Sequence, residues 1–164
     1  MERIEEQIKT QFRRAFYDTI ATAVAQQPPD AEYLTRLFKE IRDRLAQFTR
    51  PNSRSFQRIH DDLDVDFFRQ RLVHNAFDGH SMQSLVLVTF QWIRALQAPT
   101  RDAETEAAKL RVLQSGTTMA EVVPAYIREA HGCLDTLESD MRDFFENREH
   151  PVVQEAIRQA ARSI

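Results

Sequence analysis

The sequence predicts an all-α protein, an orthogonal bundle of about six or seven helices around a buried central helix. Its 164 residues include only three glycines and six prolines, and 42% are hydrophobic. This composition favours a few long helices over many short strands. Apolar residues recur three and four positions apart along most of the chain, which is the period of a helix buried on one face. We therefore expect a single helical domain over residues 1–164.

The central helix is expected at residues 80–98, the most apolar stretch of the chain. Its apolar residues fall on nearly every side of a helix and are Met82, Leu85, Val86, Leu87, Val88, Phe90, Trp92, Ile93 and Leu96. The stretch is longer than a buried strand of about 4 to 8 residues. Polar residues interrupt it before the roughly 18 uninterrupted apolar residues that indicate a membrane span. A helix of this kind should be covered on nearly all sides.

Two amphipathic helices are expected before it, at residues 2–27 and 31–49. The first has apolar residues every four positions, at Ile4, Ile8, Phe12, Phe16, Ile20 and Val24. The second has the stripe Leu34, Leu37, Phe38, Ile41, Leu45 and Phe48. Pro28 and Pro29 separate them, and Asp30 suits the N-cap of the second. Because the connection is short, an antiparallel hairpin is predicted.

A further helix follows the polar loop 50–55. Its start is expected at the cluster Asp61, Asp62, Asp64 and Asp66, because carboxylates complement the N-terminal end of the helix dipole. Its apolar side consists of Val65, Phe67, Phe68, Leu72, Val73 and Phe77. Asp78 and Gly79 are expected to end it, and His80 or Ser81 to begin the central helix.

Three helices are expected after Pro99, which ends the central one. Thr100 or Asp102 can cap a short helix at 101–114. A long helix from Thr118 has the stripe Met119, Val122, Val123, Tyr126, Ile127, Ala130, Leu134, Leu137, Met141, Phe144 and Phe145. Pro124 should kink that helix or mark its first turn. The last helix begins at Pro151 and has Val152, Val153, Ala156, Ile157 and Ala160 on one face.

Charge and cysteine content narrow the classes of function. The net charge of −3 and the pI near 6.0 do not favour general nucleic-acid binding. Cys133 is the only cysteine, which excludes an internal disulfide and is typical of a reducing compartment. The first residues lack the apolar block of a signal peptide. We therefore expect a cytoplasmic location, with a nuclear one as the alternative.

Several catalytic and metal-binding patterns are absent. A calcium loop beginning at Asp62 would have Phe67 and Val73 where glycine and glutamate are required. His60 and Asp61 resemble the dipeptide of metal-dependent phosphohydrolases, but no second histidine precedes them. Glu-x-x-His pairs, glycine-rich phosphate loops and a nucleophile elbow do not occur. We expect no catalytic residue, no cofactor and no metal ligand, and an inert buried thiol at Cys133.

Charges of opposite sign gather in two regions. Positive residues exceed negative ones between positions 36 and 58, and Arg36, Arg42, Arg44, Arg50, Arg54 and Arg58 are predicted partner-binding residues. The long helix carries an acidic face with Asp135, Glu138, Asp140, Asp143, Glu146 and Glu149. The two regions could pair within the fold, meet a partner, or form solvated faces with local ion pairs. A phosphate-binding patch is a further alternative.

Residues 59–102 resemble the T-complex protein 11 family. The matching features are Leu63–Asp66 opening a helix, Phe67–Leu72 within it, Phe77 with Asp78, the apolar helix, and Ala98–Asp102, which match the family's Ala-Pro-x-Arg-Asp signature. The resemblance implies an all-helical, non-enzymatic protein. It also implies an association with cAMP and protein kinase A signalling and, in mammals, with sperm function. It carries over no catalytic residue, and family members are typically far longer.

The signature also has a structural interpretation, with Asp64, Asp66, Pro99, Arg101 and Asp102 as its key residues. Pro99 ends the apolar helix and Asp102 is expected to cap the next one. Arg101 is expected to reach carbonyl groups at the end of the apolar helix, or a carboxylate such as Asp64 or Asp66. The signature is therefore predicted to form a corner of the fold.

Together these observations predict a non-catalytic protein-interaction or adaptor module. The resemblance adds cAMP and protein kinase A signalling as its setting. One alternative is nucleic-acid or anionic-lipid binding through the Arg-rich 36–58 surface. Another is a small helical enzyme with a site near His60, Asp64 and Arg101. The expected partner is a protein, and an exposed apolar strip could mediate a homodimer or hold a partner helix. No membrane span is expected, and nucleic acid is disfavoured as a partner.

Overall fold

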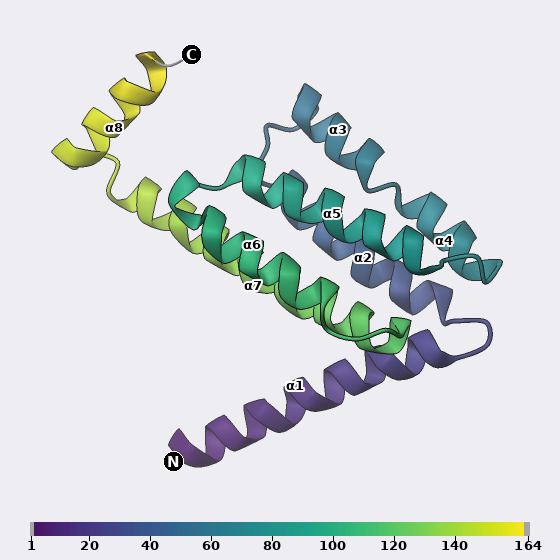
Figure 1. Ribbon diagram of the computed structural model, residues 1–164. Helices are drawn as coiled ribbons and strands as arrows, with labels where there is room; N and C mark the ends of the chain where they lie inside the picture. The colour runs from purple at the N-terminus through teal and green to yellow at the C-terminus, as the bar shows by residue number, and fades with distance from the viewer. Residues whose placement is uncertain (1, 163–164) are drawn as a thin grey trace.

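The computed structural model describes residues 2–162, apart from the side chain of Val153, and confirms the all-α prediction (Figure 1). These residues form eight α-helices and one 3₁₀ turn: α1 Glu2–Ala25, α2 Ala31–Ala46, α3 Arg54–Asp62, α4 Val65–Val73, α5 Gly79–Leu96, η1 Pro99–Arg101, α6 Asp102–Leu113, α7 Met119–Glu146 and α8 Pro151–Arg162. The count exceeds the prediction because residues 54–73 form two helices where one was expected.

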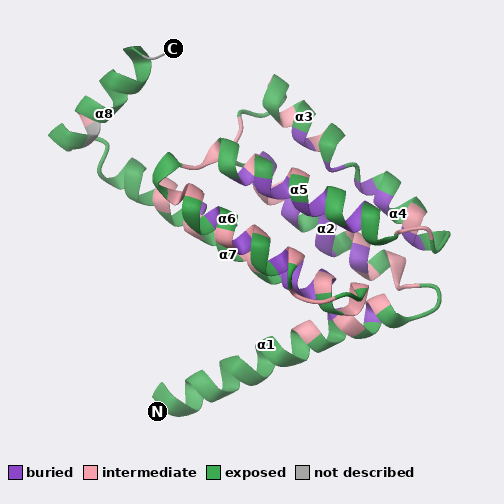
Figure 2. Cartoon of the chain, in the orientation of Figure 1, coloured by how far each residue is buried: buried purple, intermediate pink, exposed green. Residues whose placement is uncertain are grey.

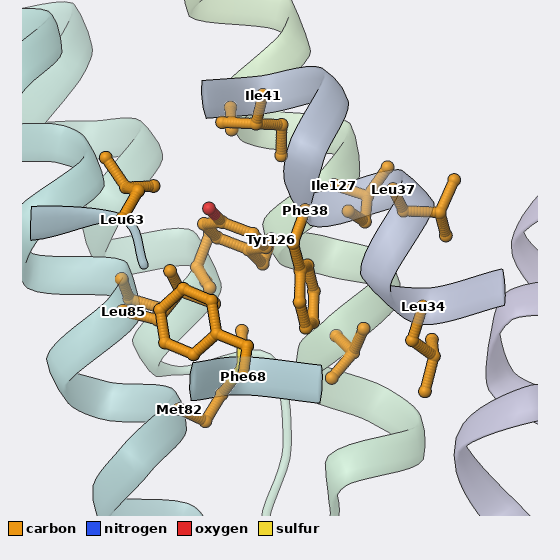
Figure 3. Packing of buried hydrophobic residues seen from close by; sticks show 14 of the residues in the cluster. Leu34, Leu37, Phe38, Ile41, Leu63, Phe68, Met82, Leu85, Tyr126 and Ile127 are labelled. Carbon is orange, nitrogen blue, oxygen red and sulfur yellow. The ribbon is translucent and has the colours of Figure 1, made fainter. Parts of the chain in front are cut away.

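Helix α7 is the central helix of the bundle. It packs against α1, α2, α5 and α6, and its Tyr126 lies fully buried at the centre of the core. Figure 3 shows Tyr126 together with Phe38 of α2 and Phe68 of α4. The ring of Phe38 lies edge-on to both neighbours, with centroids 6.0 Å from Phe68 and 6.1 Å from Tyr126. Such aromatic pairs contribute beyond the apolar area that they bury.

Helix α5 is buried along one broad face and not on nearly every side as predicted. Leu85, Val86 and Ile93 are buried, whereas Leu87 is 42% exposed and Gln91 is exposed. The reason is that α5 packs chiefly on α6 and α7, which leaves its opposite face to solvent. The central position expected for this helix belongs to α7.

Side-chain caps explain where several helices begin. Asp30 accepts a hydrogen bond from the amide of Tyr33 at 3.2 Å, so its predicted role as the N-cap of α2 is confirmed. Asp64 caps α4 in the same way, through the amide of Phe67 at 3.1 Å. Asp78 caps α5, so the prediction that it ends the preceding helix is wrong.

The acidic cluster at positions 61–66 is divided between two helices. Asp61 and Asp62 are the last residues of α3, and Asp64 and Asp66 lie at the start of α4. The prediction of one helix start at this cluster is therefore right only for the second pair. Leu63 ends α3 with a non-helical backbone and is buried, which turns the chain between the two helices.

Helix α1 leaves the bundle along its first half. Ile20 and Ala23 are buried, but residues 2–16 are all exposed (Figure 2). Its main packing partner is α7 and not α2, so the predicted hairpin with α2 is a minor contact near the loop. Apolar spacing indicates that a helix face needs a partner, but it does not identify the partner.

The last part of the chain contains α7 and α8. Pro124 lies inside α7 and is buried, and the helix begins five residues earlier, at Met119. Thr118 donates a hydrogen bond from its hydroxyl to Glu121 at 2.8 Å. Helix α8 begins at Pro151 as predicted, although the side chain of Val153, assigned to its apolar face, lies outside the described residues. Among residues 2–162, no helix is long and apolar enough to cross a membrane.

Candidate interaction surface

The arginines of the predicted Arg-rich surface have different roles in the structure, and Arg44 is the one that binds another helix. From α2, the Arg44 guanidinium reaches α7, where it bonds to Asp135 at 2.8 Å and to Glu138 at 3.2 Å. It also lies 2.7 Å from Nδ1 of His131. The basic and acidic regions therefore pair within the fold at this point, and Arg44 is unavailable to a partner. This outcome is one of the alternatives that the charge pattern left open.

His131 is held neutral by this arrangement. Burial lowers its pKa, and the positive charge of Arg44 acts in the same direction, against the opposing effects of Glu40 and Asp135. Since guanidinium groups only donate, Nδ1 of His131 must accept the hydrogen bond from Arg44. The cluster therefore joins α2 to α7 through one positive charge, two carboxylates and a neutral imidazole.

Two other arginines of α2 make local contacts. The Arg42 guanidinium pairs with the neighbouring Asp43 at 2.9 Å. Arg36 lies over the ring of Tyr33, 5.8 Å from the ring centroid. Both contacts are within one helix, with Arg36 exposed and the Arg42 side chain largely covered at 17% exposure, so neither arginine reaches another element through them.

Arg50, Arg54, Arg58 and Trp92 form what we call the α3 basic surface. Arg50 lies in the loop before α3 and Arg54 begins that helix, and neither guanidinium pairs with a carboxylate within residues 2–162. Arg58, one turn after Arg54, lies 5.6 Å from the centroid of the half-buried Trp92 ring. Trp92 in turn donates its indole N–H to Asp62 at 2.8 Å. The surface therefore combines exposed positive charge with an anchored aromatic ring.

The acidic face of α7 is also divided. Asp135 and Glu138 bind Arg44, and Asp140 binds Arg101. Asp143 and Glu146 are exposed beyond these pairs, and Glu149 lies 3.9 Å from the neighbouring Arg148. Half of the predicted acidic residues therefore hold α7 against its neighbours, and Glu149 lies beyond the end of the helix at Glu146.

Phe144 and Phe145 contradict the predicted burial of the α7 stripe. Both are exposed, and their rings contact each other at 5.8 Å between centroids. They lie in the last turn of α7, and Figure 1 shows that this end of the helix extends beyond the neighbouring helices of the bundle. The sequence pattern continues past the last residue that the fold buries.

The Ala-Pro-x-Arg-Asp signature forms a corner, as predicted, but with different contacts. The Arg101 guanidinium binds Asp140 of α7 through two hydrogen bonds of 2.9 Å each, and also contacts Glu104. The hydrogen bonds and charge of Asp140, with that of Glu104, raise the pKa of Arg101. The expected partners Asp64 and Asp66 lie instead at the start of α4. Two-point pairing of this kind fixes the orientation of the side chain.

Pro99 and Asp102 complete the corner. Pro99 begins the 3₁₀ turn, two residues after Gln97, the C-cap of α5. Asp102 is the first residue of α6, and the N-cap position belongs to Arg101, which makes no side-chain capping bond. Asp102 accepts a hydrogen bond from the Gln97 amide at 3.0 Å instead. The predicted capping role of Asp102 is therefore wrong, although its place at the start of the helix is right.

A cavity of about 170 Å³ lies beside the corner, between α6 and α7. Its lining includes Arg101, Arg111, Glu129 and the half-buried Cys133. Arg111 pairs with Glu129 at 3.1 Å, so the charges on its wall are balanced. Burial raises the pKa of the Cys133 thiol, which keeps it protonated. Sequence reasoning did not identify this cavity, because its walls come from helices paired only in three dimensions.

The residues proposed for an alternative enzyme do not form a common site. The His60 ring bonds to the Phe56 carbonyl at 2.9 Å, Asp64 caps α4, and Arg101 binds Asp140. Within residues 2–162, no hydrogen bond or ion pair joins any two of the three. The same residues contain no group of three or more histidine, cysteine, aspartate or glutamate side chains placed to hold a metal ion.

The chain matches the model of a known protein family. No solved structure matches the chain. The family model described as T-complex protein 11 matches residues 1–155, which include every helix from α1 to α7 and the signature corner at Arg101. The match extends the resemblance seen at residues 59–102 over most of the chain, so this protein belongs to the T-complex protein 11 family.

Proposed function

We propose that this protein is a non-catalytic interaction module that binds an acidic segment of a partner protein through the α3 basic surface. The family resemblance suggests cAMP and protein kinase A signalling as the setting and the cytoplasm as the location. The proposal is narrower than the sequence-based expectation, because Arg44 is used within the fold and Arg36 and Arg42 make local contacts.

The observation that carries the proposal is that the exposed Arg50 and Arg54 pair with no carboxylate within residues 2–162, while Arg58, one turn after Arg54, lies over the Trp92 ring. Arginine and tryptophan are the residue types that most often dominate the energy of protein interfaces. Trp92 is already oriented by its bond to Asp62, so little conformational freedom would be lost on binding. Positive charge on this surface would attract an acidic partner and orient it.

The proposal that the module is non-catalytic rests on how its reactive groups are used. His60, Asp64 and Arg101 each make a contact that stabilises a helix or a corner. The Cys133 thiol lies beside an arginine whose charge is already matched by Glu129. A catalytic base or nucleophile would instead be expected to face a substrate with a free polar atom.

The test is quantitative affinity capture with the tagged chain from extracts of its own cells. The variant Arg50→Glu/Arg54→Glu/Arg58→Glu reverses the charge of the α3 basic surface. Its matched control is Arg142→Glu/Arg158→Glu/Arg162→Glu, which reverses three exposed arginines on α7 and α8. A second control, Arg101→Ala, changes the signature corner. We expect the partner to be lost with the first variant and retained with both controls.

A salt titration on heparin distinguishes the nucleic-acid and anionic-lipid alternative. A polyanion binder would be retained on heparin in a strongly salt-dependent way, and the α3 variant would elute early. Retention of this kind without any captured protein would contradict the proposal. Equal loss of the partner with the α3 variant and the α7–α8 control would contradict it as well, because general charge would then explain the binding.

A further inference from the structure

The first half of α1 carries apolar side chains into solvent. Ile4, Ile8, Phe12 and Phe16, which we call the α1 stripe, are 61%, 46%, 72% and 43% exposed. Figures 1 and 2 show this half of the helix extending away from the bundle with no described element beside it. A contiguous apolar patch of this kind is typical of an interaction site.

The spacing of the stripe determines how two such helices could pack. Its members are four residues apart, so each is turned by about 40° from the previous one around the helix axis. Rows of this type interlock when two helices cross at about 50°. A long coiled coil requires the different spacing of a heptad repeat. The stripe therefore suits a short crossing contact centred near Ile8 and Phe12.

The charges beside the stripe favour one direction of crossing. The row one residue after the stripe contains the charged residues Glu5, Lys9 and Arg13, whereas the row on the other side contains Arg3, Gln7, Gln11 and Ala15 and so has one charge. In an antiparallel homodimer, equivalent flanks meet, so Glu5 of each copy would lie beside Arg13 of the other. Lys9 would lie near the two-fold axis, where Glu6 of its own helix, 3.9 Å away, offsets its charge. In a parallel pair, the charged row of one helix would instead lie beside the largely uncharged row of the other, so these charges would not pair.

From these observations we infer that the α1 stripe binds the α1 stripe of a second copy of this chain, in an antiparallel crossing about a two-fold axis. The contact is isologous, which is the commonest arrangement in homodimers. It involves four apolar side chains from each copy, so the dimer should be one that dissociates on dilution. This interface lies on α1 and is separate from the α3 basic surface proposed for the partner protein.

The apolar part of the contact is tested by sedimentation velocity of the full chain over a range of concentrations. The wild-type chain should pass from monomer to dimer. Phe12→Ser should raise the dissociation constant of the dimer at least about tenfold, because Phe12 is the most exposed member of the stripe. Leu110→Ser is the matched control, since Leu110 is a 42% exposed residue on α6. This control should dimerise like the wild type.

The direction of the crossing is tested by exchanging charges. Glu5→Arg and Arg13→Glu should each weaken the dimer, and the double variant Glu5→Arg/Arg13→Glu should restore it, because the pair is then opposite in sign again. Asp61→Arg, at an exposed position of α3, is the charge-matched control and should have no effect. Failure of the double variant to recover the dimer would overturn the antiparallel arrangement. Circular dichroism of each variant checks that the helices are retained.

A monomer at every concentration would overturn the inference outright. In that case co-sedimentation with vesicles of phosphatidylcholine and phosphatidylserine tests whether the α1 stripe binds a lipid surface instead. Vesicle binding that is lost with Phe12→Ser would assign the stripe to a lipid surface, since an amphipathic helix can lie at such an interface. A dimer that is unaffected by Phe12→Ser would show that the copies meet elsewhere.

Discussion

The hydroxyl groups of Thr89 and Tyr126 lie 2.9 Å apart in the core, and neither side chain has any exposed surface. Thr89 belongs to α5 and Tyr126 to α7, so the bond joins the two helices at the centre of the bundle. Burial raises the pKa of the Tyr126 hydroxyl, which therefore stays protonated and able to donate. A buried polar pair is stabilising only while both members remain satisfied.

Removal of either hydroxyl should destabilise the protein, but to different extents. In Tyr126→Phe, the Thr89 hydroxyl can turn to the carbonyl one turn earlier in α5, so the cost should be about 1 kcal/mol. In Thr89→Val, the Tyr126 hydroxyl has no alternative partner within its helix, so we expect about 2 to 3 kcal/mol. Urea unfolding measures both variants and their combination. The double variant should cost less than the two single variants together, and strict additivity would contradict a direct bond.

The two-point bond between Arg101 and Asp140 should make a lysine a poor replacement. Arg101→Lys keeps the positive charge but can satisfy only one carboxylate oxygen at a time, so the melting temperature should fall by about 2–4 °C. Arg142→Lys is the control, because Arg142 contacts Glu138 through one 3.4 Å bond. Thermal unfolding followed by circular dichroism should show little change for that control. Equal effects of the two variants would argue against the geometric role of Arg101.

The helices and caps could be predicted from the sequence because they depend on residues close together in the chain. Asp30 and Asp64 each cap a helix through an amide three residues later. The bond of Arg101 to Asp140 spans 39 residues, and that of Arg44 to Asp135 spans 91. Several acidic residues could have met either arginine, and charge alone does not choose among them. The candidate surface was therefore predicted too broadly, and the fold removed Arg44 from it.

Burial was the least predictable property. The stripe of α1 and that of α2 have similar spacing, yet Leu34 is buried and Phe12 is 72% exposed. The spacing of a stripe indicates that one face of a helix is apolar, but whether another helix covers that face depends on the tertiary packing. Tertiary packing also explains why Leu87 is exposed on α5, the most apolar helix, and why α7 occupies the centre of the bundle.

His131 should make the stability of the fold decrease as the pH drops below 6.5, which is the ordinary pKa of a histidine side chain. Its pKa is lowered in the folded protein by burial and by Arg44, so the unfolded chain binds more protons in this range. Stability is therefore fully present above pH 6.5 and is lost as the pH falls towards the folded pKa. The lowered carboxyl pKa values of Asp78 and Glu129 act at lower pH.

The measurement is the free energy of unfolding in urea between about pH 7.5 and pH 5.5. His131→Gln should reduce the slope, because the amide oxygen can still accept a hydrogen bond from Arg44 without titrating. His74→Gln, at the exposed end of α4, should keep the wild-type slope. If His131→Gln leaves the slope unchanged, the neutral imidazole between Arg44 and Asp135 is not its source.

Gly116, just before α7, and Gly132, within α7, should respond to alanine in opposite directions. A Cβ atom at Gly132 would meet nothing within 4 Å, and alanine favours a helix over glycine by about 0.8–1 kcal/mol, so Gly132→Ala should stabilise the protein by about that amount. A Cβ atom at Gly116 would collide with the carboxylate of Glu121 and lie 2.6 Å from its Cβ. Gly116→Ala should therefore destabilise the protein, since Glu121 must move and lose its bond to Thr118. The measurement is the free energy of unfolding in urea for both variants. A loss of stability in Gly132→Ala would contradict the open space next to Gly132, in the cavity that it lines together with Cys133.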